Sequence, residues 1–136
     1  MIRNPAKARL RDGGVALGTM VCETWSGEIA YALAAAGFDF FLIDKRAQRG
    51  RHGIHPADRP RRTERQYLHP KMKEAYGRVQ EVAERHGVAA GLHPDDLAVV
   101  QEGRAMGMRC LMCSTEIEIL LGAARQAVQA LRGERR

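Results

Sequence analysis

The chain has 136 residues, 45% of them hydrophobic, which suits a single globular domain with a real core. Its formal net charge of +6 can favour anionic partners, although the charge is concentrated in one segment. No apolar run approaches the roughly 18 residues that cross a bilayer, which argues against a membrane protein. Three cysteines and no apolar leader favour a reduced, cytoplasmic chain without structural disulfides.

The first 44 residues predict a strand–helix–strand unit. Residues 4–12 are expected to form a short polar helix, and the apolar run 15–21 a buried strand. Ser26 can cap a helix that ends at Gly37, and residues 38–44 are aromatic and branched, as in a strand. Two strands and a helix within about 30 residues imply parallel pairing with a right-handed crossover.

The apolar pattern stops after Asp44. Residues 45–65 carry two acidic and eight basic residues, so their net charge of +6 equals that of the whole chain. The basic residues are Lys45, Arg46, Arg49, Arg51, Arg59, Arg61, Arg62 and Arg65. We interpret residues 45–68 as an irregular, Arg-rich segment. It holds no recognisable nucleic-acid motif, so a solvated basic loop is the simpler interpretation, and nucleic acid is not the expected partner.

The alternation of helix and strand resumes at Pro70. The expected elements are a helix from Pro70 that stops at Gly87, a strand over 88–92, a helix capped by Asp95 or Asp96 that ends at Gly107, a strand over 109–113, and a last helix whose apolar stripe runs from Ile117 to Leu131. This rhythm of alternating strands and helices predicts an α/β protein.

Two spacings that resemble metal or redox motifs have simpler explanations. Cys110 and Cys113 fall on a predicted strand, where residues three apart face opposite sides of the sheet, so a packing role is preferred. His52 and His55 would chelate a metal on a helix, but the neighbouring Gly53 favours a loop.

The order of these segments resembles the HpcH/HpaI-type metal-dependent 2-oxo-acid aldolases. Gly18-Thr19, Glu28 and residues 36–44 match the family's first two βα units. Residues 53–58 (Gly-Ile-His-Pro-Ala-Asp) match its strand-six motif, and residues 69–72 (His-Pro-Lys-Met) match the opening of the next helix. Residues 88–91 and 109–121 match its last two strands. The resemblance rests on the order and spacing of these segments along the chain.

The resemblance implies a partial (β/α)₈ barrel. The family barrel has roughly 250 residues, so this chain would be one truncated aldolase-barrel domain over residues 1–136, with strands three to five missing. About five parallel strands, in the order six-seven-eight-one-two and with flanking helices, are then expected. The implied reaction cleaves a 4-hydroxy-2-oxo acid to pyruvate and an aldehyde through an enolate that Mg²⁺ or Mn²⁺ stabilises.

The family's catalytic residues are only partly matched. Of its two metal-binding carboxylates, only the strand-six aspartate has a counterpart, Asp58. Its general-base histidine is replaced here by Ala47, and the adjacent glutamate by Arg46. Because a hard cation prefers several oxygen ligands, Asp58 needs a second carboxylate. The candidates near predicted C-terminal strand ends are Asp44, Glu116, Asp95 and Asp96.

The remaining candidates follow the rule that barrel active sites form at the C-terminal ends of the strands. His93 ends a predicted strand and can replace the lost base; Asp44 is the second catalytic candidate. The substrate-binding candidates are Gly18, Ser114 and Glu116. The alternative for His93 is a surface histidine before a helix, and the alternative for Asp58 is a solvated acid in a basic loop.

Three interpretations of function remain open. The first is an aldolase-type carbon–carbon lyase, impaired or inactive in this chain, that acts on a small 2-oxo acid. Its open sheet edges predict a homo-oligomer, since unpaired strands invite pairing with another chain. The second is a non-catalytic remnant domain that binds an anionic partner through the Arg-rich segment. The third is a truncated or spliced gene product without a selected function.

Overall fold

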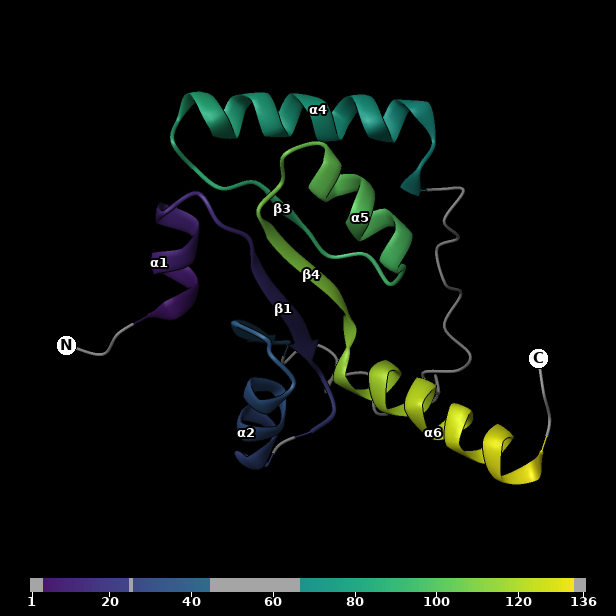
Figure 1. The fold of residues 1–136 in the computed structure, drawn as a ribbon. Coiled ribbons are helices and arrows are strands. Elements are labelled where there is room, and N and C mark those ends of the chain that lie inside the picture. Colours follow the sequence, from purple (N-terminus) through teal and green to yellow (C-terminus); the bar gives the residue numbers. More distant parts are fainter. Residues whose placement is uncertain (1–3, 25, 45–66, 134–136) are drawn as a thin grey trace.

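The computed structural model describes residues 4–24, 26–44 and 67–133. Within these ranges, helices alternate with strands along the chain (Figure 1). The elements are α1 (Pro5–Arg11), β1 (Ala16–Val21), α2 (Glu28–Ala35), β2 (Phe40–Ile43), α4 (Pro70–Arg85), β3 (Gly91–Leu92), α5 (Leu97–Ala105), β4 (Cys110–Thr115) and α6 (Glu116–Arg132). No helix in the described part of the chain is both long and apolar enough to cross a bilayer.

The described strands form one parallel sheet in the order β2-β1-β4-β3. The first strand of the chain therefore lies between the second and the last, as expected if the two ends of a barrel sequence remain neighbours. The predicted α/β class, the parallel pairing and this order are confirmed. The predicted fifth strand falls on residues 53–58, and the Arg-rich segment on 45–68; residues 45–66 lie outside the described ranges, so both stay predictions.

Local signals explain most helix boundaries. The side chains of Asn4 and Asp96 accept hydrogen bonds from backbone N–H groups in the first turns of α1 and α5. Gly37 follows α2 with φ +94°, a conformation that favours glycine and stops the helix. The prediction for Ser26 was wrong by one residue. The N-cap of α2 is Gly27, although Ser26 Oγ still accepts from the N–H of Glu28 at 3.3 Å.

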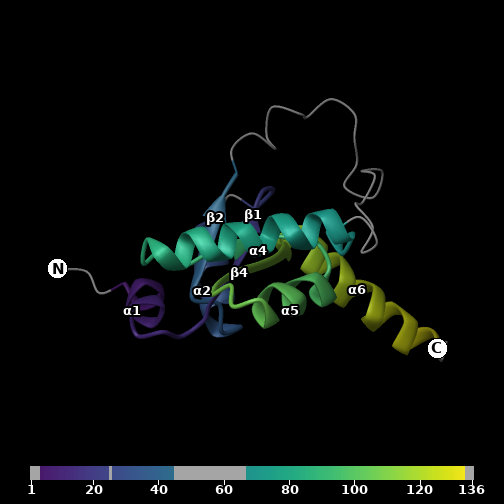
Figure 2. The ribbon, with the colours of Figure 1, turned by 90° about the horizontal axis from the view of Figure 1, so that it is seen from above.

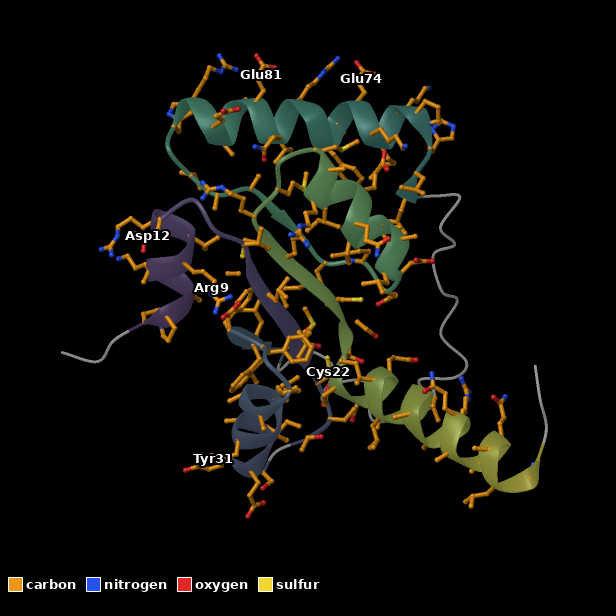
Figure 3. All side chains as sticks on the ribbon, in the orientation of Figure 1. Arg9, Asp12, Cys22, Tyr31, Glu74 and Glu81 are labelled. Carbon is orange, nitrogen blue, oxygen red and sulfur yellow. The ribbon has the colours of Figure 1, made fainter. Side chains whose placement is uncertain are left out.

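The core lies on the β3–β4 side of the sheet. Ala90, Val100, Met108 and Leu111 are buried there as one cluster, because α5 packs its apolar residues against β3 and β4. Figure 1 shows α5 next to these strands and α4 at the top, beyond their upper ends, and Figure 2 shows both helices from above. The charged side of α4 faces away from the sheet, as Glu74 and Glu81 show in Figure 3.

The other flank of the sheet is less covered. Leu42 and Ile43 of β2 are 51% and 57% exposed, and β2 is the outermost strand of the described sheet. At the other end of β2, Arg9 extends from α1 to Asp39 and forms an ion pair at 3.3 Å (Figure 3). The second carboxylate oxygen of Asp39 accepts the N–H of Leu17 at 2.9 Å, which fixes the start of β2 beside β1.

Candidate functional site

The C-terminal ends of the strands meet at one edge of the sheet because all described pairs are parallel. Figure 1 shows the ends of β1 and β4 side by side, next to the start of α6. Three of the candidate residues are brought together at this edge. They are His93, which follows β3, Ser114 at the end of β4, and Glu116, the first residue of α6.

Ser114 lies in a bulge of β4. The β1–β4 register pairs Gly18 with Met112 and then Met20 with Thr115, so β4 carries one extra residue. Within the bulge, Ser114 adopts φ +57°, a left-handed conformation that a residue other than glycine seldom occupies. Bulges of this kind often lie next to active sites, where they redirect a side chain.

The His93 ring is anchored through one nitrogen. Its Nε2 lies 2.7 Å from the carbonyl oxygen of Ser114. Because a carbonyl oxygen only accepts hydrogen bonds, Nε2 must carry the proton in this contact. The neutral ring then has its lone pair on Nδ1, which makes no hydrogen bond within the described residues. His93 is half-buried. The lone pair makes Nδ1 the ring atom that can accept a proton from a donor.

Glu116 orders the loop that follows β1. Its Oε1 accepts backbone N–H groups from Cys22, Glu23 and Thr24 at 2.9, 2.5 and 2.9 Å, and its Oε2 accepts the N–H of Cys22 at 3.0 Å. Glu116 is only 6% exposed. Both carboxylate oxygens are thus used by the protein's own backbone, so the described contacts make Glu116 a latch between α6 and the β1 loop.

The hydrogen bonds to Glu116 also change its acidity. Burial is the largest single influence and acts to raise the pKa of the carboxyl group. The backbone N–H groups of residues 22–24 and Ile117 act in the opposite direction and together outweigh burial. The pKa of Glu116 is therefore lowered, and the side chain is a carboxylate at neutral pH.

Gly18 and Asp44 lie apart from the His93 cluster. A Cβ on Gly18 would lie 2.6 Å from the Phe40 ring, so a larger residue there would displace this ring, and Gly18 has a packing role between β1 and β2. Asp44 follows β2, and its N–H donates to the Val21 carbonyl at 3.0 Å. Two strands separate β2 from β3 in the sheet, which puts Asp44 on the order of 14 Å from His93 at the usual strand spacing.

The metal hypothesis has no support from the described residues. They contain no group of three or more His, Cys, Asp or Glu side chains placed to hold an ion. Asp96 is used as a helix cap, and Glu116 is used by the loop latch. Asp58, His52 and His55 lie outside the described ranges. The residues that are described do not fit Mg²⁺ or Mn²⁺, and Asp58 as a ligand stays a prediction.

The cysteines of the C-x-x-C spacing lie on β4, as expected, and both are free. Burial raises the pKa of the Cys110 thiol. Burial also raises the pKa of the Cys113 thiol, and the nearby Asp95 and Asp96 carboxylates raise it further. Thiols with raised pKa values are poor nucleophiles and poor metal ligands, which agrees with a packing role.

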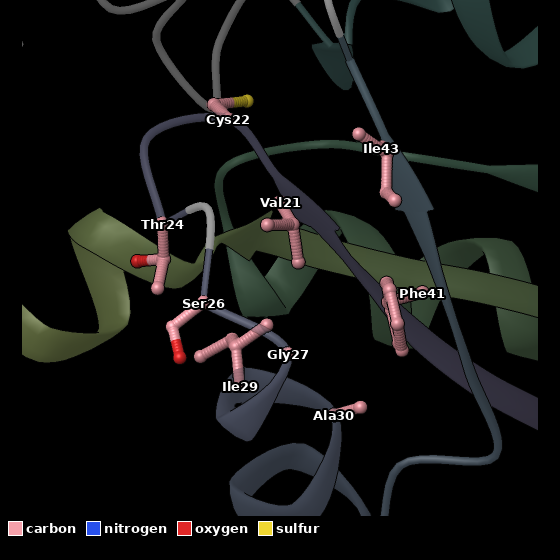
Figure 4. Close-up of a pocket in the computed structure, with 9 residues that line it drawn as sticks. All are labelled: Val21, Cys22, Thr24, Ser26, Gly27, Ile29, Ala30, Phe41 and Ile43. Atoms are coloured by element: carbon pink, nitrogen blue, oxygen red, sulfur yellow. The ribbon is translucent and has the colours of Figure 1, made fainter.

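A cavity of about 150 Å³ lies between α2 and the strands β1 and β2. Figure 4 shows Val21 and Phe41 of the strands and Ile29 of α2 around it. The thiol-bearing Cys22 also lines it, but no described lining residue is a carboxylate or an imidazole. The cavity is therefore an apolar packing gap beside the site and offers no acid or base.

Sequence reasoning missed Thr19. It is fully buried, and its Oγ1 lies 3.2 Å from the Cys113 carbonyl oxygen and 3.1 Å from that of Ser114. In the sequence, Thr19 is only one position of the predicted apolar strand over residues 15–21. The bulge in β4 brings two carbonyl groups to the Thr19 hydroxyl, and no local sequence pattern predicts this bulge.

Comparison with solved structures relates this arrangement to a known fold. The chain superposes on the crystal structure of an HpcH/HpaI aldolase from Desulfitobacterium hafniense DCB-2 with a TM-score of 0.68 and 16% identity, covering 93% of this chain and 96% of that one. The predicted resemblance is confirmed at the level of the fold.

A second match is an HpcH/HpaI aldolase/citrate lyase family protein from Burkholderia cenocepacia J2315, with a TM-score of 0.45 and 29% identity. It covers 87% of this chain and 43% of that protein, so this chain spans less than half of it. No family model matches the sequence, and no curated protein matches it significantly.

Proposed function

We propose that this chain is an aldolase-type carbon–carbon lyase of low activity that cleaves 4-hydroxy-2-oxo acids to pyruvate and an aldehyde. The observation that carries the proposal is the placement of His93, with its free Nδ1, at the C-terminal edge of an aldolase-like parallel sheet. Active sites of barrel enzymes form at this edge. Both the reaction and the substrate class come from the family resemblance.

The chemistry assigned to His93 is general base catalysis. Nδ1 accepts the proton of the substrate's 4-hydroxyl group, and the bond between C3 and C4 breaks as the C4 carbonyl forms. The electron pair of that bond passes into the enolate of pyruvate, which takes up a proton at C3. No oxidant or co-reactant is needed, because the two products together have the composition of the substrate.

A low rate is expected because the enolate receives little stabilisation from the described residues. In the family that the sequence resembles, a divalent cation supplies this charge stabilisation, but the described side chains do not form a site for one. Ala47 and Arg46 also stand where the family has its base and a glutamate.

The first prediction concerns the base. With a 4-hydroxy-2-oxo acid and Mg²⁺ or Mn²⁺, we expect pyruvate release well below the typical enzyme turnover of about 10 per second. His93→Gln is expected to lower this rate by about 10²-fold, the lower end of what a general base contributes. A coupled lactate dehydrogenase assay measures the pyruvate.

His86→Gln is the matched control, since His86 is an exposed histidine at the C-terminus of α4 and away from the site. Equal rates for the wild type and His93→Gln would contradict the role of His93. Absence of pyruvate release from the wild type with either metal would contradict the lyase function itself.

The second prediction is self-association through the outer edge of β2. Two adjacent apolar residues, Leu42 and Ile43, are exposed on β2, the outermost strand of the described sheet, and such an edge invites pairing with a second copy. Sedimentation velocity is expected to show a concentration-dependent dimer or larger species that Leu42→Lys weakens. Tyr31→Lys is the control, because Tyr31 is 80% exposed on α2 and not on the strand (Figure 3). A wild type that stays monomeric at all concentrations would exclude this interface.

A further inference from the structure

We propose that Thr19 is a positioning residue that holds His93 as the Nε2–H tautomer with Nδ1 available as the base. The proposal rests on the proposed function, because the position of Nδ1 matters only if the site performs the cleavage. Thr19 was not among the site residues predicted from the sequence, and it acts on His93 through the backbone of β4.

The bulge in β4 is built around the Thr19 hydroxyl. Regular pairing stops after Gly18 with Met112 and resumes at Met20 with Thr115, so Thr19 lies opposite the extra residue. Its Oγ1 lies 3.2 Å from the Cys113 carbonyl oxygen and 3.1 Å from that of Ser114. One hydroxyl proton is thus shared between the carbonyl groups of the two bulged residues.

The conformation of Ser114 needs such support. Its φ of +57° belongs to a region in which a residue other than glycine persists only when its surroundings hold it. Among the described residues, three contacts hold Ser114: its carbonyl oxygen accepts from the Thr19 hydroxyl and from the His93 Nε2–H, and its N–H donates to the Pro94 carbonyl oxygen at 3.0 Å. Thr19 is the one that comes from β1, across the bulge.

The Ser114 carbonyl oxygen links Thr19 to His93, since it accepts from both. Without the Thr19 hydroxyl, the bulge can relax toward a right-handed conformation, which turns this carbonyl away from the imidazole. His93 then loses the acceptor that orients its ring, and Nδ1 moves relative to the substrate. A displacement of about 1 Å can lower a catalytic rate by about a hundredfold.

The test is Thr19→Val, which keeps the shape of the side chain and removes only the hydroxyl. In the wild type, we expect a His93 Nε2–H resonance that is protected from exchange in a ¹H–¹⁵N spectrum. Thr19→Val is expected to lose this resonance, and kcat for pyruvate release is expected to fall by about tenfold or more, with KM changed by less than about twofold. Thr19→Ser should restore both.

Two further variants complete the experiment. Tyr31→Phe is the control, because it also removes one hydroxyl group, from a side chain on α2 that is 80% exposed. Ser114→Gly in the Thr19→Val background keeps the experiment decisive if the single variant does not fold, since glycine adopts φ near +57° without strain. In this double variant, the His93 resonance should return.

A folded Thr19→Val protein that keeps both the His93 resonance and the wild-type kcat would overturn the proposal. So would a double variant in which the resonance stays absent. If the wild type releases no pyruvate, the proposed function fails, and the His93 resonance alone still decides whether Thr19 positions the ring.

Discussion

Replacing Gly91 with alanine is expected to detach β3 from the sheet and to lower the free energy of unfolding by about 3 kcal/mol. A Cβ on Gly91 would lie 2.0 Å from the carbonyl oxygen of Cys110, the residue with which Gly91 pairs. The obstacle is backbone and not a flexible side chain, so the strand itself must move. Urea denaturation followed by circular dichroism measures the loss.

Gly122→Ala is the matched control for this variant. Gly122 lies inside α6, and a Cβ there would meet nothing within 4 Å. Alanine is favoured over glycine in a helix, so we expect a gain of about 0.5–1 kcal/mol. Equal effects of the two substitutions would show that β3 does not pair with β4 as described.

Replacing Glu116 with glutamine is expected to lower the free energy of unfolding at neutral pH by about 2 kcal/mol. The carboxylate accepts from three consecutive N–H groups of the loop after β1, and an amide offers only one oxygen and no charge. Glu23→Gln is the control, because Glu23 is an exposed carboxylate in the same loop. Similar losses in both variants would contradict the latch.

The same latch predicts how stability depends on pH. Because folding lowers the pKa of Glu116, its contribution is present above the usual value of 4.5 and is lost as the pH falls below that value through the folded-state pKa. The difference in unfolding free energy between the wild type and Glu116→Gln should therefore shrink on acidification. Denaturation curves at neutral pH and near pH 3 measure this, and a constant difference would refute the assignment.

The parts of the fold that could be predicted depend on local signals. The aromatic and branched residues before Asp44 predict β2, and Gly37 ends α2 because its φ is positive. The strand predicted over residues 88–92 was too long, because β3 contains only Gly91–Leu92. The reason is long-range: the Ala90 carbonyl oxygen accepts from both Arg109 and Cys110, so the regular ladder cannot extend further upstream.

The position of the candidate site residues could be predicted from the sequence, but their hydrogen-bond partners could not. His93 follows β3, Ser114 lies near the end of β4 and Glu116 begins α6, so these three residues lie at the C-terminal edge of the sheet, and their roles in a site stay predictions. The partners of these residues lie up to 95 positions away, as in the contact between Thr19 and Ser114, and no local pattern encodes them. The left-handed Ser114 is also invisible in the sequence, because a serine at a strand end predicts an ordinary extended residue.

The most direct test of the account is a titration of the ¹⁵N-labelled chain with pyruvate, followed residue by residue in ¹H–¹⁵N spectra. If the carboxyl edge of the sheet is a 2-oxo-acid site, amide shifts should concentrate at His93, Ser114 and residues 22–24, which the latch joins to α6. Shifts that are absent, or confined to the opposite edge near Gly107 and Arg109, would contradict it.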